Sequence, residues 1–314
     1  MRIEQHRKFE QLLRIEKHQL TAAIKKYIDY RIKTEQVTRT KMAYSNFYKK
    51  FRKFLYGYDK REVLLSSNGI GKDYVNYLLG LDLSNTTIKH QIDLLIVVLN
   101  QLDLHHDVRV KVLFKGMARS SRENEDYFLT NEEVKQLVNY KPRDKVEQVM
   151  LDRFLVACFT GCRISEIQTV KILDQNRLKY TSTKTKKDII VPYNKMVRPY
   201  IESGLFLTKL KIEHEFKANK FLHQILKRLK WNNQVTKYRA AGKKKTRYNV
   251  PRWQAITFHS ARKFYGKMLL DLDVPLYKVS KLLGHTSIAV TQDTYAAITR
   301  EKMVDEVNEL IDKF

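Results

Sequence analysis

Apolar residues recur at helical spacing over most of the first 117 residues. Residues 1–35 contain neither glycine nor proline and are predicted to form a helix. Three further segments show the same spacing, namely Met42, Phe47, Phe51, Phe54 and Leu55, then Tyr74 to Leu79, then Ile88, Ile92, Leu95, Leu99 and Leu102. Ser84 is placed to cap the last helix. The pattern predicts a helical extension over residues 1–36 and a small helical bundle over 37–117.

The predicted extension has two possible roles. It could hold accessory DNA or a neighbouring subunit, or it could be a solvated helix that packs loosely on its own domain. Its pattern fits both interpretations, because one apolar stripe serves either contact.

A polar stretch without periodicity follows the bundle and is predicted to be a linker over residues 118–126. A capping box from Thr130 to Glu133, with Leu129 and Val134 as its hydrophobic staple, then predicts the start of a helix. The apolar run from Phe154 to Phe159 predicts a buried helix that ends at Thr160-Gly161. Residues 127–314 are therefore expected to form a second domain.

One β-hairpin is predicted in this second half, from Tyr180 to Pro192. β-branched residues flank its polar Lys-Lys-Asp tip, and Pro192 ends its second strand. Amphipathic helices are predicted over residues 216–231 and 301–314. The last of these must cover its own domain or a neighbour's. The expected fold class is mainly α with a small β-sheet or hairpin.

The charge of the chain is strongly positive, with 60 Lys and Arg against 34 Asp and Glu and a formal net charge of +26. The cations are spread along the chain, so the folded surface should attract a polyanion, most commonly nucleic acid. A ribosome-associated or heparin-binding protein would have the same charge. The candidate DNA-binding residues are Lys49, Lys50, Lys53, Lys237, Arg239, Lys243, Lys244, Lys245 and Arg247. The segment 237–247 is interpreted as a phosphate-tracking loop or a solvated mobile one.

The two cysteines, Cys158 and Cys162, stand one helical turn apart. They could be half of a metal site or two small buried residues, and the second interpretation is favoured because no partner motif accompanies them. The N-terminus is charged where a signal peptide is apolar, and the run Leu94–Leu99 is too short to cross a bilayer. We expect a soluble cytoplasmic protein.

Candidate chemistry gathers late in the chain. His259 and Arg262 form a His-x-x-Arg pair, His285 ends a Leu-Gly-His, and Tyr295 follows ten residues later. Guanidinium groups match phosphate oxygens, imidazoles move protons near neutral pH, and a phenol can be a covalent nucleophile. Arg163, in the segment Thr160–Glu166, would by itself indicate an ordinary ion pair with Glu166. Together these residues point to chemistry at a phosphodiester.

In these segments the chain resembles the tyrosine recombinase (phage integrase) family. The family carries an arginine in T-G-x-R-x-S-E, a lysine on a β-hairpin, H-x-x-R, L-G-H and a C-terminal tyrosine, and all five are present in the family's order. The resemblance is strong from Tyr127 onwards and rests on pattern alone from Val37 to Met117. It implies a helical core-binding domain and a catalytic domain that form a C-shaped clamp on DNA, with Lys184 as the hairpin lysine.

The resemblance also implies a mechanism. Tyr295 would attack the phosphodiester, form a 3′-phosphotyrosine and release a 5′-hydroxyl. His259 would be the base, Lys184 the acid, and His285 a hydrogen-bond donor to the phosphate. Arg163, oriented by Glu166, and Arg262 would stabilise the charge that builds up. No cofactor or metal is required.

The implied function is site-specific recombination, integrating or excising a phage or another mobile element. The implied partners are double-stranded DNA, three further copies in a tetramer on DNA joined by exchange of C-terminal helices, and accessory bending or excision factors. Alternatives are a catalytically silent DNA-binding protein on the same scaffold and a type IB topoisomerase, which shares the chemistry.

The chain departs from the family at one point. The tyrosine usually falls nine residues after the Leu-Gly-His histidine, and here it falls ten residues after His285. We therefore expect either an extra residue looped out within 289–294 or a different approach of Tyr295.

Overall fold

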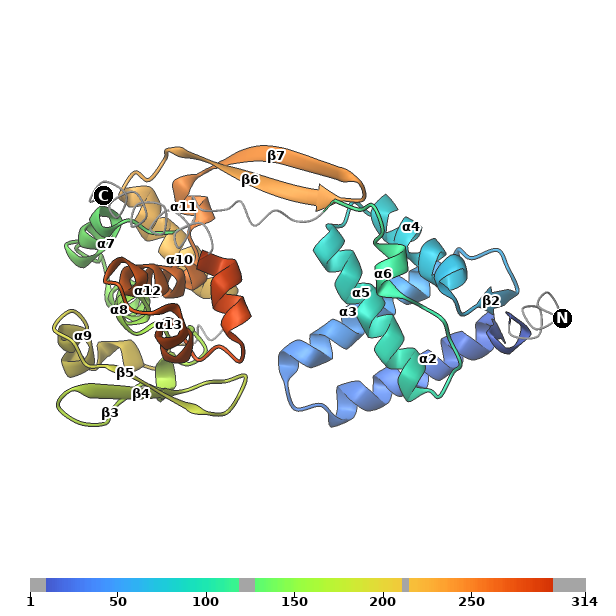
Figure 1. Ribbon diagram of the computed structural model, residues 1–314, viewed down its shortest axis with the longest axis horizontal. Helices are drawn as coiled ribbons and strands as arrows, with labels where there is room; N and C mark the ends of the chain where they lie inside the picture. The colour runs from blue at the N-terminus through green and yellow to red at the C-terminus, as the bar shows by residue number, and fades with distance from the viewer. Residues whose placement is uncertain (1–9, 119–127, 211–214, 296–314) are drawn as a thin grey trace, which may run out of the picture. The chain divides into compact units, whose positions relative to one another are not determined.

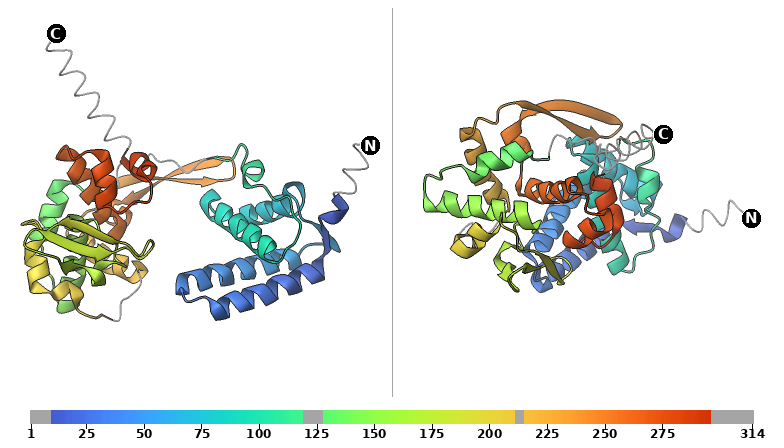
Figure 2. Two further views of the ribbon diagram at one scale, coloured as in Figure 1. Left: turned by 60° about the horizontal axis from the view of Figure 1, so that its bottom comes forward. Right: turned by 60° about the vertical axis from the view of Figure 1, so that its left-hand side comes forward.

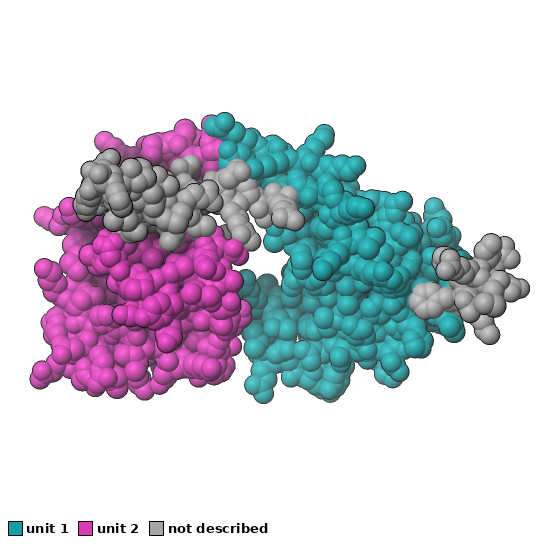
Figure 3. All heavy atoms as spheres, viewed as in Figure 1, with its two compact units in different colours: residues 1–121, 238–247 teal, residues 122–237, 248–314 magenta. Residues whose placement is uncertain are grey.

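The computed structural model describes residues 10–118, 128–210 and 215–295, and the chain divides into two compact units (Figure 3). Unit 1 comprises residues 1–121 and 238–247, and unit 2 comprises residues 122–237 and 248–314. Both are mainly helical with small sheets (Figure 1), so the predicted fold class is confirmed. Within the described residues, no helix is both long and apolar enough to span a bilayer.

Unit 1 is a helical bundle with one short antiparallel sheet. Its elements are β1 (Arg14–Glu16), α2 (Lys17–Thr34), α3 (Thr38–Tyr56), β2 (Glu62–Leu64), the π-helical turn η1 (Ser67–Gly71), α4 (Lys72–Gly80), α5 (Asn85–Gln101) and α6 (Val110–Leu113). Aromatic rings join α3 to α4, with Phe51 and Tyr74 edge to face at 4.9 Å between centroids. Such pairs add directional contacts to the burial of apolar surface that holds the bundle together. The predicted cap at Ser84 is confirmed, because its side chain accepts from the amide of Thr87.

Two predictions for unit 1 are wrong in detail. Residues 14–16 are not helical but form β1, which pairs with β2 so that Ile15 lies opposite Val63. A partner so far along the chain leaves no local signal. Met42, predicted on the apolar face of α3, is exposed. The helix α2 is not an appendage, since Leu20 and Ile24 are fully buried in the core of unit 1.

Unit 2 surrounds one buried helix. Its elements are α7 (Asn131–Val138), α8 (Lys145–Thr160), the 3-10 turn η3 (Ile167–Thr169), β3 (Lys171–Ile172), β4 (Arg177–Thr181), β5 (Asp188–Pro192), α9 (Arg198–Ser203), the 3-10 turn η4 (Leu205–Leu207), α10 (Glu215–Arg228), α11 (Arg252–Ala255), α12 (Phe258–Asp271), α13 (Leu276–Leu282) and a helix over residues 288–295. Almost all of α8 is buried, and α12 packs along it. The predicted capping box of Thr130 and Glu133 is confirmed.

The end of α8 is fixed by Gly161. This residue has φ of 72°, a left-handed conformation that glycine adopts without strain, and its amide bonds to the carbonyl of Ala157. A Cβ atom here would also lie 2.5 Å from Cδ1 of Tyr265. The turn that begins with Gly161 places Arg163 beside α12.

The predicted hairpin is confirmed, with β4 pairing antiparallel to β5 and β3 added on the other side of β4. This three-stranded sheet forms one edge of unit 2 (Figure 2), and β5 contacts α13. Lys186 has φ of 57° in the connection between β4 and β5. The sheet thereby holds the connecting residues 182–187 beside α13.

The basic segment predicted as a loop is instead a second β-hairpin, made of β6 (Gln234–Ala241) and β7 (Lys244–Pro251). The strands could not be recognised from the lysine-rich sequence, because most of β7 is exposed to solvent and therefore lacks the apolar alternation of a buried strand. Its end, residues 238–247, belongs to unit 1. There the Asn85 amide donates to the Gly242 carbonyl at 2.8 Å, and the Gly242 amide donates back at 2.7 Å.

Two predicted features lie outside the described residues. These are the linker, apart from Ala118, and the helix over residues 301–314. Their structures stay predictions.

Candidate active site

A cavity of about 170 Å³ in unit 2 brings together all six residues predicted to act at a phosphodiester. They come from five places in the chain: the turn after α8, the β4–β5 connection, α12, the turn after α13, and the helix 288–295. The six are Arg163, Lys184, His259, Arg262, His285 and Tyr295. Arg163 and Tyr295 are more than 130 residues apart in the sequence, and the packing of α12 on α8 helps to bring them together.

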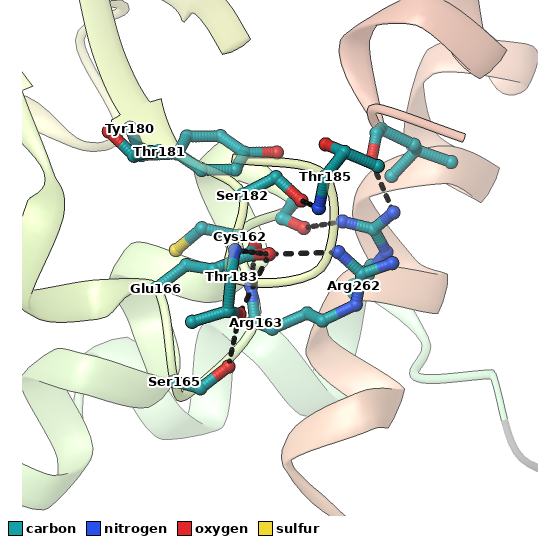
Figure 4. A network of polar contacts seen from close by, with 12 residues as sticks. Cys162, Arg163, Ser165, Glu166, Tyr180, Thr181, Ser182, Thr183, Thr185 and Arg262 are labelled. Carbon is teal, nitrogen blue, oxygen red and sulfur yellow. Dashed lines mark hydrogen bonds and ion pairs between the residues drawn. The ribbon is translucent and has the colours of Figure 1, made fainter. Parts of the chain in front are cut away.

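Arg163 is held by a buried carboxylate. Its Nη1 donates to Oε1 of Glu166 at 2.9 Å, and its own amide donates to Oε2 at 2.9 Å (Figure 4). Glu166 is fully buried and also accepts from the Thr183 amide at 3.2 Å. About a third of the Arg163 side chain remains exposed. The guanidinium is therefore oriented yet still reachable by an anion.

Arg262 is held by main-chain carbonyls instead. It is 2% exposed, and its guanidinium donates to Gly161 O at 2.8 Å and to Leu283 O. Burial above all, and also the charge of Arg163, lowers the pKa of Arg262. These contacts join the end of α8, α12 and the turn after α13 around one fixed cation.

Both histidines are poised to be uncharged at neutral pH. Desolvation and the nearby positive charges, Arg262 first, lower the pKa of His259 and that of His285 to about 4 each. His259 nevertheless lies at the surface of the cavity and is solvent accessible. A bound phosphodiester would add negative charge among the cations and raise both pKa values toward neutrality. An uncharged imidazole can accept a proton, as a base must.

His285 has a partner that sequence inspection did not single out. Its Nδ1 lies 2.8 Å from Oγ1 of Thr291, a fully buried residue in the helix 288–295. Thr291 stands one helical turn before Tyr295. The histidine turn is therefore fastened to the helix that carries the tyrosine.

Lys184 lies on the exposed wall of the cavity, in the connection between β4 and β5. Its neighbours Lys186 and Lys187 do not line the cavity. The amide of Thr185 donates to Oγ of Ser182 at 3.3 Å, which shapes this connection (Figure 4). Of the three candidate lysines, the structure brings only Lys184 to the other predicted residues.

The described residues from Ile288 to Tyr295 form an unbroken helical stretch. No residue in 289–294 is looped out, so of the two expected consequences of the longer spacing, the first is wrong. The phenol is 2% exposed, and its hydroxyl is 3.5 Å from Arg262 O and 3.4 Å from Lys263 O. Burial raises the pKa of Tyr295, and the charge of Arg262 opposes that rise.

Lys263 is a further cation in the cavity that sequence inspection missed. It lines the same cavity, its Nζ lies 5.2 Å from the centre of the Phe128 ring, and burial lowers its pKa. The Phe128 ring is itself 5.7 Å from that of Tyr295. The signal in the sequence was that Lys263 directly follows Arg262. Neighbouring side chains of a helix point in different directions, so this position alone is weak evidence that Lys263 lines the cavity.

The candidate DNA-binding residues are spread over both units. Lys49 and Lys53 are exposed on α3, while Lys50 is partly buried there. On the second hairpin, Lys243, Lys244, Lys245 and Arg247 are exposed. Arg239 is paired with Asp82 at 2.9 Å, and the half-buried Lys237 has its pKa lowered by burial. The structure does not gather them into one cavity.

Cys158 and Cys162 are free buried thiols, and desolvation raises the pKa of each. Across the described ranges, no three His, Cys, Asp or Glu side chains come together as a metal site would require. The two cysteines are packing residues of α8 and its end, as favoured from the sequence.

Comparison with known proteins places this chain in one class, which is described as the phage integrase family. The model of that family matches residues 127–302, more than half of the chain. The chain therefore belongs to the phage integrase family.

A curated relative is the tyrosine recombinase XerA of Pyrococcus furiosus, 25% identical over 185 residues. That alignment covers 57% of this chain and 60% of XerA. Among solved structures, the Tn1549 transposon integrase in complex with a circular intermediate DNA is 15% identical, with a TM-score of 0.63 over 91% of this chain and 98% of that one. XerH recombinase bound to its palindromic difH substrate is 13% identical, with a TM-score of 0.61 over 97% of each chain. At these identities the solved structures show a shared fold.

Proposed function

We propose that this protein is a site-specific tyrosine recombinase, an integrase that cleaves and rejoins DNA and serves a phage or another mobile element. Membership of the phage integrase family supports the class. The observation that carries the proposal is the cavity, which holds two arginines, two histidines, a lysine and a tyrosine suited to one phosphodiester.

The arginines supply the electrostatic part of the reaction. Negative charge grows on the non-bridging oxygens of phosphorus during attack, and donors fixed in advance stabilise it without reorganising. Arg163 is fixed by Glu166 and Arg262 by two carbonyls. The His285 Nε2 would donate to the same oxygens if Thr291 donates to Nδ1, because a neutral imidazole carries one N–H.

The proton transfers follow from the remaining side chains. The Tyr295 oxygen bonds to phosphorus, and the bond from phosphorus to the 5′-oxygen breaks. His259 takes the phenol proton, and Lys184 protonates the leaving 5′-oxygen. A 5′-hydroxyl of another strand then attacks the 3′-phosphotyrosine in the reverse sense and restores Tyr295. Because the covalent link conserves the energy of the phosphodiester, no nucleotide is consumed.

DNA contact would involve both units. Residues 37–117 of unit 1 would act as the core-binding domain, with exposed cations on α3 and on the end of the second hairpin contacting phosphates. The recombining assembly would be a tetramer on paired sites in the cytoplasm, joined by exchange of residues 301–314 and assisted by DNA-bending or excision factors. The C-shaped clamp also stays a prediction.

Covalent capture on nicked DNA tests the proposal. The protein is incubated with a pool of nicked duplexes that includes the ends of the element encoding it, denatured, and assayed for a protein–DNA adduct. We expect an adduct at Tyr295 that disappears in Tyr295→Phe. Tyr277→Phe is the matched control, since Tyr277 is half exposed on α13 and lies outside the cavity.

Other results of this experiment would favour one of the alternative functions or another nucleophile. Tight, site-specific binding without an adduct would favour a silent DNA-binding protein on this scaffold. An adduct together with relaxation of supercoiled plasmid that shows no site preference would favour topoisomerase activity. An adduct that persists in Tyr295→Phe would show that another tyrosine is the nucleophile.

A further inference from the structure

The middle of α12 contains a glycine at the point where Tyr295 rests. Gly266 is buried within the helix, and a Cβ atom added to it would lie 2.0 Å from Oη and 2.4 Å from Cζ of Tyr295. No side chain fits at such distances. The observed position of the phenol therefore depends on the absence of a side chain at residue 266.

Backbone conformation does not explain this glycine. Gly266 lies inside the continuous helix Phe258–Asp271, where alanine would be favoured because glycine loses more conformational freedom on folding. Gly161, by contrast, adopts a left-handed conformation. What Gly266 provides is space, for one particular side chain.

The same gap exposes main-chain acceptors. The carbonyls of Arg262 and Lys263 lie one turn before Gly266, on the side that its side chain would cover. The Tyr295 hydroxyl reaches them at 3.5 and 3.4 Å. Both distances are long for hydrogen bonds between oxygens, so the two contacts are weak. They place the phenol oxygen against the backbone of α12.

This arrangement is unsuited to attack. The phenol is buried, and the two carbonyl oxygens that its hydroxyl reaches cannot take up its proton. The burial that shields it also raises the pKa of Tyr295. A nucleophile has to lose its proton and reach phosphorus, so the phenol must leave this position before the reaction.

We propose that Gly266 is a positioning residue that gives Tyr295 a resting place on the backbone of α12, from which the phenol has to move before it attacks. The part of this proposal that concerns cleavage rests on the function proposed for Tyr295. The part that concerns the position of the phenol on α12 does not. It makes the glycine a control on how often the nucleophile is presented to a bound phosphodiester.

A double-mutant cycle tests the resting place without DNA. The melting temperature is measured for wild type, Gly266→Ala, Tyr295→Ala and the double variant. The control is Gly80→Ala at the end of α4, where an added Cβ meets nothing within 4 Å. We expect Gly266→Ala to lower the melting temperature when Tyr295 is present and to raise it in Tyr295→Ala, because only the helix preference for alanine then remains.

The double variant keeps the test decisive if Gly266→Ala alone fails to fold. A folded double variant next to an unfolded single variant is itself the expected coupling. Equal shifts from Gly266→Ala in both backgrounds would overturn the proposal.

The second half of the test measures cleavage in a single turnover on a nicked duplex. We expect Gly266→Ala to form the Tyr295 adduct several-fold faster than wild type, with unchanged DNA affinity, because the phenol no longer has to leave the helix. Slower adduct formation would mean that the position on α12 is the working one, and would overturn the proposal.

Failure of the proposed function and failure of the proposed resting place give different results. If wild type forms no adduct on its cognate site while the melting cycle shows the coupling, the proposed function fails and the resting place stands. In that case the ionisation of Tyr295, followed by ultraviolet absorbance against Tyr295→Phe, should still shift to lower pH in Gly266→Ala, since the phenol gains solvent. An unshifted ionisation would count against the resting place.

Discussion

The cations of the cavity and Tyr295, its proposed nucleophile, are held in different ways. Arg163 is fixed by a fully buried carboxylate and Arg262 by two carbonyls. The Tyr295 hydroxyl makes two long contacts, with the carbonyls of Arg262 and Lys263, and the residue lies in the helical stretch that begins at Ile288. Under the proposed function, the cations are therefore in place before DNA arrives, while the phenol still has to move.

The difference fits what each part has to do. Donors that stabilise a transition state are most effective when they need not move, because reorganising them during the reaction would cost free energy. A nucleophile that is always in place would react with any phosphodiester that entered. Separating the two lets cleavage wait for a conformational step, as in many enzymes with gated sites.

The largest expected effect comes from removing one of the two fixed arginines, in the variant Arg262→Ala. Cleavage should fall by about 10² to 10³-fold or more, the usual result of removing one oxyanion donor. Stability should fall by about 2–5 kcal/mol, because the carbonyls of Gly161 and Leu283 lose their partner inside the protein. Single-turnover cleavage and urea unfolding measure the two effects. Unchanged stability would show that these carbonyls find other partners.

A smaller effect is expected when the contact that holds Arg163 is weakened and the arginine itself is kept. Glu166→Gln keeps the shape of the side chain but replaces a charged hydrogen-bond acceptor of Arg163 by a neutral one. We expect cleavage to slow by about tenfold, or about 1.4 kcal/mol in the barrier. Thr169→Val, which alters a neighbouring hydroxyl outside the cavity lining, serves as the control. Equal rates for Glu166→Gln and wild type would show that Arg163 does not depend on the carboxylate charge.

The contact between His285 and the helix that carries Tyr295 can also be removed, in the variant Thr291→Val. It removes the hydroxyl that contacts His285 while keeping the shape, and one hydrogen bond contributes about 0.5–1.5 kcal/mol. Cleavage should slow by about 2- to 12-fold, and Thr291→Ser should restore it. The nitrogen chemical shifts of His285 should show a change in the ring's protonation site in Thr291→Val alone. The same shifts in all three proteins would contradict the role of Thr291.

The smallest effect is a dependence of stability on pH. Because the folded-state pKa values of His259 and His285 are lowered to about 4, the unfolded chain binds more protons between about pH 6.5 and pH 4. Their contribution to stability is complete above that window and is lost as pH falls through it. Discounted for solvent access, His285 should contribute on the order of 1 kcal/mol. Urea unfolding at pH 7 and pH 4.5 should show a smaller difference for His285→Gln, and an identical difference would contradict the shift.

Six residues of the cavity could be named from the sequence because each belongs to a short motif whose residue types fit phosphate chemistry. The helices of both units were predictable for a related reason, since their apolar residues repeat locally, as in Phe47 and Phe51 of α3. Lys184 needed more, because two other lysines stood beside it and only the course of the β4–β5 connection separates them.

What could not be predicted depends on distant contacts. The strand β1 exists because Ile15 meets Val63, and the second hairpin is held by Asn85, far away in the sequence. The contact of Thr291 with His285 requires the turn after α13 to fold back. Gly266 did leave a signal, a glycine inside an apolar helical pattern, but its reason is visible only where Tyr295 rests.

The contacts of Arg262 have a consequence for how such a protein would decay over generations. A residue that joins three segments of the fold cannot be lost without harming the folded state, whereas Lys184 lies exposed on a surface connection. In a lineage that no longer needs recombination, mutation should erase Lys184 early and Arg262 late. A surviving arginine at this position is therefore weak evidence of activity in a relative, and a surviving lysine on the hairpin is stronger.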